Sequence, residues 1–84
     1  MDLSWDKDAW EDYVYWQKTD KTILRRINEI IKECLRTPFE GKGKPEPLKE
    51  NLSGFWSRRI TDEHRLVYRV EDGRLHIIQC RFHY

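Results

Sequence analysis

Two segments of this 84-residue chain carry side chains suited to acid–base chemistry at a bound phosphate. The chain ends in residues 81–84, which place a cation, an imidazole and a phenol at the end of a predicted strand. The central segment 38–49 is basic and holds one carboxylate, Glu46, between two prolines, which limit the entropy lost when it is positioned. The imidazole of His83 changes charge near neutral pH. Together the two segments predict an acid/base pair with phosphate contacts around it.

Length and composition limit the chain to a single domain, residues 1–84, that buries about 60 to 65 per cent of its unfolded surface. No apolar run approaches the length of a membrane span, and no basic-plus-apolar leader begins the chain. We therefore expect a cytoplasmic protein with no membrane partner. Cys34 and Cys80 fall on predicted apolar faces without metal-ligand spacing, so we expect buried free thiols.

Charge is distributed unevenly along the chain. The first 20 residues carry six acidic and two basic side chains, a balance of −4, so the remaining 64 carry +5. This asymmetry favours an acidic face and a basic face that meets a polyanion. An ordinary mixed surface is the alternative.

Two helices are predicted in the first half of the chain. After a short strand at 3–5, Asp6 is a plausible N-cap for a helix over residues 7–17. Asp20 caps a second helix, whose apolar residues follow helical spacing without a gap. Pro38 ends this helix, because a proline disfavours helical geometry at the residue before it.

The second half is predicted to be β structure. The hairpin signal Asp72-Gly73 joins the last two strands. The order βααβββ gives an α+β fold, an antiparallel sheet with the two N-terminal helices packed on one face. The other face is then an open, basic platform that carries Arg65. The three strands are expected at 55–61, 64–71 and 74–84.

The predicted register contains a conflict. If Asp72-Gly73 closes a regular two-residue turn, Arg65 falls on the same face as Tyr84 and not as His83. Three arrangements would each resolve this conflict: a loop with an odd number of residues, a bulge that changes the direction of the last side chains, or a position of His83 beyond the strand end. Because bulges are common next to active sites, we expect one here.

Four stretches of the sequence closely resemble the YoeB toxins of the RelE superfamily. The resemblance spans nearly the whole chain and rests on long motifs; Phe82 departs from it by lacking a hydroxyl expected there. It implies a RelE-like microbial ribonuclease-type fold and a toxin of a bacterial type II toxin–antitoxin pair. Such a toxin is an endoribonuclease that enters the ribosomal A site, cleaves mRNA and inhibits translation. The four stretches are residues 37–48, 52–61, 64–68 and 83–84.

The same resemblance implies partners and residue roles. The partners would be a YefM-like antitoxin, the ribosome and mRNA, while a monomer or a homodimer of the free toxin both remain open. Glu46 would be the general base, His83 the general acid, and Arg65 the stabiliser of the transition state. RNA would be held by Lys49, Arg59 and Tyr84. To these we add Lys44, which draws phosphate towards Glu46, and Trp56, which can stack on a base.

The residue types in the sequence also support RNA cleavage independently of the family resemblance. Metal-free RNA cleavage needs a base for the 2′-OH proton, an acid for the departing 5′ oxygen and a cation for the phosphorane. Glu46, His83 and Arg65 supply one of each, and a guanidinium offers the bidentate fork that a phosphorane needs. The three histidines show no metal-ligand spacing, so we expect no metal and no other cofactor.

Plainer interpretations stay open at this point. Glu46 could be an ordinary loop carboxylate, His83 a structural strand residue and Arg65 a solvated one. Arg58 and Arg59 could be edge charges that prevent pairing between sheets. A non-enzymatic inhibitor on the same scaffold, of the kind that poisons DNA gyrase, and a plain RNA-binding module are the alternative functions.

Overall fold

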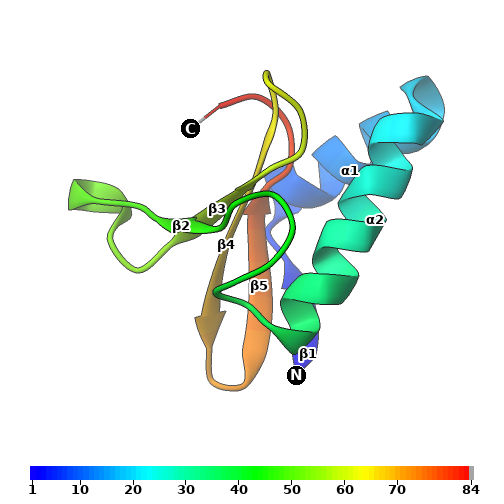
Figure 1. Ribbon diagram of the computed structural model, residues 1–84. Coiled ribbons are helices and arrows are strands. Elements are labelled where there is room, and N and C mark those ends of the chain that lie inside the picture. The colour runs from blue at the N-terminus through cyan, green and yellow to red at the C-terminus, as the bar shows by residue number, and fades with distance from the viewer. Residues whose placement is uncertain (84) are drawn as a thin grey trace.

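The structure, a computed structural model, describes residues 1–83 and confirms the α+β fold. The sheet has the strand order β1-β5-β4-β3-β2, and both helices lie on one side of it (Figure 1). None of the helices within residues 1–83 is long and apolar enough to cross a membrane. The elements are β1 (Asp2–Trp5), α1 (Lys7–Thr19), α2 (Lys21–Arg36), β2 (Glu46–Pro47), the 3₁₀-helix η1 (Glu50–Leu52), β3 (Trp56–Arg59), β4 (Arg65–Glu71) and β5 (Arg74–Gln79).

The sheet is mixed, which corrects the prediction of a purely antiparallel one. β1 runs parallel to β5, with Asp2 opposite Arg74, whereas the other neighbours are antiparallel. The turn signals in the sequence specify hairpins between consecutive strands, but they do not specify the distant partner of β1. The two-residue strand β2 is also additional to the predicted order, and it places Glu46 directly opposite Ser57.

The helices begin and end close to the predicted residues. The carboxylate of Asp20 accepts hydrogen bonds from the backbone N–H groups of Thr22 and Ile23, at 3.0 and 3.1 Å, and so caps α2. Asp6 occupies the N-cap position of α1, but among the described residues its side chain accepts no bond from that helix. α2 ends at Arg36, before Pro38, as predicted.

The apolar core lies between the helices and the sheet. Cys34 and Cys80 are buried free thiols in it, as predicted, and burial raises the pKa of both, which keeps them protonated. The indole N–H of Trp16 donates to the Cys80 carbonyl at 2.9 Å, which ties α1 to the end of β5. α2 and the sheet contribute Ile27, Ile30, Ile31, Leu66, Tyr68, Leu75 and Ile77.

The predicted bulge is present, but it lies within the β4–β5 ladder. Val67 is opposite Gln79, whereas Tyr68 is opposite Ile77, so one residue of β5 is extra. The predicted strand 74–84 is too long: β5 ends at Gln79, which lies opposite Val67 inside β4, and the chain then turns away with a left-handed Phe82 (φ 65°). The part of that prediction concerning Tyr84 lies outside the described residues.

Candidate active site

A cavity of about 160 Å³ brings four of the predicted residues together. The ladders place Glu46 opposite Ser57 and Arg59 opposite Arg65, so three adjacent strands contribute to one wall. Strand alternation puts Ser57 and Arg59 on the face opposite to the side that packs against the helices. The lining residues are Gly43, Lys44, Glu46, Ser57, Arg59 and Arg65.

The cavity carries an excess of positive charge. Lys44, Arg59 and Arg65 contribute three cations, while Glu46 contributes the single carboxylate among its lining residues. Cations gathered in a recess attract polyanions and raise their local concentration. The site is therefore suited to bind a phosphate with a carboxylate beside it.

Arg58, which could have been an edge charge from the sequence alone, is fully buried on the face of β3 that packs against the helices. Its Nε donates to the Tyr68 hydroxyl at 3.2 Å, and that hydroxyl donates to the Pro38 carbonyl at 2.6 Å. Because adjacent strand residues face opposite sides, one member of the Arg58–Arg59 pair had to face the helices. This alternation was the signal that could have identified it. The Arg58 guanidinium also donates to the carbonyls of Thr37, Glu40 and Lys42, at 2.5, 2.9 and 3.1 Å.

These contacts fix the segment that leads to Glu46. Gly43 lies against β3, where its carbonyl accepts a hydrogen bond from the Arg59 backbone N–H at 2.7 Å. Gly43 has φ 81°, and a Cβ there would come within 2.8 Å of the Arg59 carbonyl oxygen. Only glycine permits both the backbone conformation and this approach. Arg58 and Gly43 therefore hold the segment that brings Lys44 and Glu46 into the lining of the cavity.

We expect Arg58→Met to lower the free energy of unfolding by about 3 kcal/mol, because the carbonyls that Arg58 satisfies would lose their buried donor. Urea denaturation measures the change. Arg25→Met, at an exposed position of α2, is the matched control and should change stability by less than about 0.5 kcal/mol. Equal stability of the two variants would show that Arg58 does not hold this segment.

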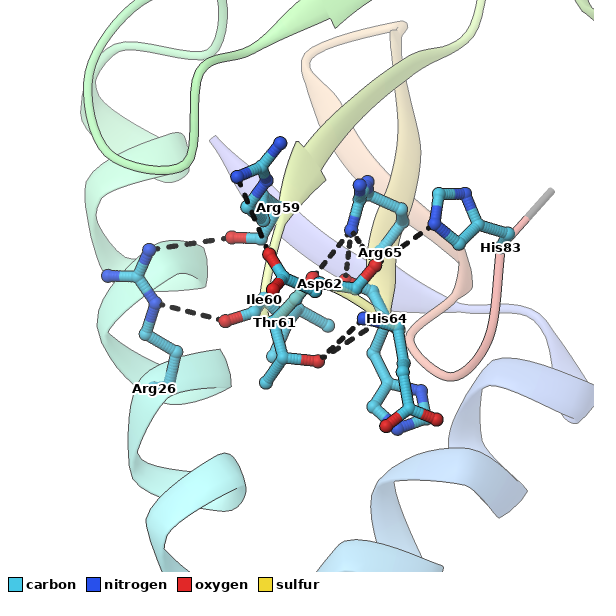
Figure 2. Close-up of polar contacts among 9 residues, drawn as sticks. Arg26, Arg59, Ile60, Thr61, Asp62, His64, Arg65 and His83 are labelled. Atoms are coloured by element: carbon cyan, nitrogen blue, oxygen red, sulfur yellow. Dashed lines mark hydrogen bonds and ion pairs between the residues drawn. The ribbon is translucent and has the colours of Figure 1, made fainter.

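A second group of contacts surrounds the turn between β3 and β4 (Figure 2). Nη1 of Arg65 donates to the Thr61 carbonyl at 2.5 Å and lies 3.3 Å from the Asp62 carbonyl. Nε2 of His83 lies 3.1 Å from that same Asp62 carbonyl. A carbonyl can only accept, so this nitrogen of His83 carries a proton in the observed arrangement. Arg65 and His83 thus share one backbone acceptor.

Side chains of α2 and β3 also contact the turn between β3 and β4. Arg26 of α2 donates to the carbonyls of Ile60 and Arg59, at 3.4 and 3.5 Å. Nη1 of Arg59 lies 3.7 Å from a carboxylate oxygen of Asp62 (Figure 2). This ion pair is exposed, so it orients Arg59 weakly and leaves it able to exchange Asp62 for an incoming anion.

Three further residues were predicted to bind RNA, and none of them is among the described lining residues of the cavity. Trp56 packs with the core side of the sheet, with its ring 4.7 Å from that of Phe39, and the structure does not bring it to the cavity. Lys49 follows β2 as an exposed residue and is not among the cavity's described lining residues. Tyr84 lies outside the described residues. Ser57 was missed, although its alternation with Arg59 along β3 could have indicated it.

No group of three His, Cys, Asp or Glu side chains within residues 1–83 could hold a metal ion. The chemistry that the described side chains offer is proton transfer and anion stabilisation. Glu46 can accept a proton, His83 can donate one, and Arg65 can bind an anion with its guanidinium.

Two helices on one side of a mixed sheet, with a cationic cavity on the other, make up the α+β fold that is also found in a solved YoeB/ParE toxin. Residues 5–84 match the family described as YoeB-like toxin of bacterial type II toxin-antitoxin system, and the chain belongs to this family. It is therefore a toxin of a type II toxin–antitoxin system. Toxin YoeB of Escherichia coli O6:H1 is 69% identical over 84 residues, which cover 100% of both chains.

Solved structures agree with this assignment. A YoeB/ParE toxin from Agrobacterium tumefaciens superposes with a TM-score of 0.96 at 56% identity, covering 100% of both chains. A heterotetrameric YoeB–YefM toxin–antitoxin complex and a YoeB dimer, both from Staphylococcus aureus, give TM-scores of 0.91 and 0.92. Each is 47% identical to this chain and covers 100% of it and 98% of the solved chain.

Proposed function

We propose that this toxin is an endoribonuclease that cleaves mRNA in the ribosomal A site and so inhibits translation. One observation carries the proposal: Glu46 shares a cavity with Lys44, Arg59 and Arg65, and Arg65 shares a backbone acceptor with His83. The base and the cation therefore share the cavity, and the acid lies beside the turn that holds Arg65. This set matches the three requirements for metal-free RNA cleavage.

In the proposed reaction, Glu46 takes the proton of the 2′-OH and the 2′ oxygen forms a bond to phosphorus. The bond from phosphorus to the 5′ oxygen breaks, and the departing oxygen takes the proton held on Nε2 of His83. The products are a 2′,3′-cyclic phosphate and a free 5′-hydroxyl. Arg65 binds the equatorial oxygens of the phosphorane, where a planar guanidinium donates two parallel hydrogen bonds.

The other cations hold the RNA backbone in this proposal. Lys44 and Arg59 contact the flanking phosphates from the cavity wall, and Lys49 and Tyr84 extend the contact surface. Phosphate contacts of this kind position RNA without reading its sequence. Stacking by Trp56 is left out, because its ring packs against Phe39 on the other side of the sheet.

We infer that the partner is a YefM-like antitoxin, as in the S. aureus complex. Its acidic segment would cover Arg59, Arg65 and the terminal residues, and so neutralise the site by charge and by occlusion. The toxin would act in the cytoplasm on the ribosome and mRNA. A homodimer, as in the S. aureus YoeB structure, is the assembly we propose for the free toxin.

The test is to induce the toxin in bacteria and to map mRNA 5′ ends. Cuts should cluster at start codons, inside translated frames. Arg65→Lys keeps the charge but loses the fork, and we expect it to reduce cutting about 100-fold. Arg74→Lys, an exposed change in β5, is the control and should cut like the wild type. Intact mRNA together with inhibited gyrase supercoiling would support the gyrase inhibitor, and RNA binding without cuts would support the binding module.

A further inference from the structure

The chain leaves the sheet after β5 through a backbone turn that its own sequence disfavours. Phe82 has φ 65°, a left-handed conformation that is rare for a bulky residue. Such a conformation persists only where the surrounding structure holds it. His83 follows directly, so whatever fixes Phe82 also fixes the direction of the imidazole.

One anchor of this turn is Gln79, the last residue of β5. Its side-chain nitrogen Nε2 lies 2.9 Å from the Arg81 carbonyl oxygen and 3.1 Å from those of Phe82 and His83, so its two hydrogens are shared among three acceptors. All three partners are acceptors, so the amide must present its NH₂ group to them. Three carbonyl oxygens that converge on one point repel each other unless a donor lies between them. Gln79 supplies that donor.

A second anchor is His64, in the turn before β4. Its Nδ1 accepts the backbone N–H of Phe82 at 2.8 Å, and an N–H group can only donate, so Nδ1 is unprotonated. The ring is buried and packs edge-on against Trp16, with centroids 4.8 Å apart. The Arg65 backbone N–H donates to the Phe82 carbonyl at 3.1 Å. Both polar backbone groups of Phe82 are therefore held by β4 and the turn that precedes it.

The residues just before the turn are bound to α1. The carboxylate of Asp12 accepts the Cys80 backbone N–H at 3.1 Å, and the Arg81 guanidinium lies 3.6 Å from the ring centroid of Tyr15. The path from Gln79 to Phe82 is thus fixed at every residue.

We propose that Gln79 and His64 are positioning residues that hold the terminal turn and direct His83 towards the scissile phosphate. This inference rests on the proposed ribonuclease function. Neither side chain is among the described lining residues of the cavity, and both bond instead to the backbone of the terminal turn. A shift of about 1 Å in a catalytic group can reduce a rate by about 100-fold.

The test for Gln79 uses Gln79→Met, which keeps the length of the side chain and its neutrality but removes the donor. We expect the single-turnover rate of mRNA cleavage on programmed ribosomes to fall tenfold to 100-fold, with unchanged affinity for the ribosome. The imidazole NMR signals of His83 should shift, while those of His76 stay in place. Gln17→Met, at an exposed position of α1, is the matched control and should change neither measurement.

The test for His64 compares two substitutions. The Oδ1 atom of His64→Asn can accept the Phe82 N–H in place of Nδ1, whereas His64→Leu cannot. We expect His64→Asn to retain most of the rate and of the His83 signal positions, and His64→Leu to lose both. Comparing the pair separates loss of the acceptor from loss of packing against Trp16.

Wild-type cleavage by Gln79→Met, or a lower rate with His83 signals at their wild-type positions, would overturn the proposal for Gln79. Equal losses in His64→Asn and His64→Leu would overturn it for His64. If the wild-type protein cleaves no RNA, the proposed function fails. The NMR comparison still decides in that case whether Gln79 orients His83.

Discussion

Glu46→Gln is expected to lower the single-turnover rate of mRNA cleavage on programmed ribosomes by about 10²-fold to 10⁴-fold. The amide has nearly the shape of the carboxylate but cannot take the 2′-OH proton. Glu46 is an exposed residue of β2, so its backbone rather than its side chain joins it to the sheet opposite Ser57. Thermal unfolding should therefore remain at the wild-type temperature.

The control for this experiment is Glu50→Gln. Glu50 is also exposed and lies in η1, just after β2, but it does not line the cavity. Each substitution removes one negative charge. If only Glu46→Gln lowers the cleavage rate, the cause is therefore lost proton transfer and not a change in the electrostatic field of the protein. Cleavage by Glu46→Gln at the wild-type rate would remove Glu46 from the mechanism.

His83→Gln should reduce the rate on ordinary mRNA by about the same factor, because the departing 5′ oxygen would leave without a proton. A substrate with sulfur in place of that oxygen has a leaving group that needs no protonation. On this substrate, His83→Gln should cleave nearly as fast as the wild type, whereas Glu46→Gln should stay slow. Single-turnover rates on the two substrates give this comparison.

His76→Gln is the matched histidine control. His76 lies in β5, outside the described lining of the cavity, and its Nδ1 is 2.6 Å from the Ser4 hydroxyl. It should cleave both substrates like the wild type. If sulfur does not restore cleavage by His83→Gln, His83 contributes something other than the leaving-group proton.

The helices and the β4–β5 hairpin could be predicted from the sequence, because their signals lie within a few neighbouring residues. The apolar periodicity of α2, its cap at Asp20 and its end before Pro38 are confirmed. The hairpin at Asp72-Gly73 is confirmed as the link between β4 and β5. Because side chains alternate along a strand, the conflict in the register also favoured a bulge near the last residues; a bulge is present, but within the β4–β5 ladder. The resemblance correctly implied the family, and alternation places Arg65 away from the helices.

How these elements pack against each other could not be predicted from local patterns. Arg58 and Arg59 are adjacent in sequence, yet one is buried under the segment 37–44 and the other lines the cavity. Trp56 lies on the same side as Arg58 and packs on Phe39, so its aromatic character alone could not assign it to RNA. Contacts of this kind depend on backbone carbonyls brought together from distant parts of the chain.

The same reason explains two of the errors in the sheet. The parallel pairing of β1 with β5 joins residues about 70 positions apart, so no turn signal specifies it. β5 ends at Gln79, opposite Val67, where the chain enters the turn that Gln79 and His64 hold by hydrogen bonds. Local patterns determine which segments can be helix or strand, but partners and strand ends follow from long-range hydrogen bonds that form only in the folded chain.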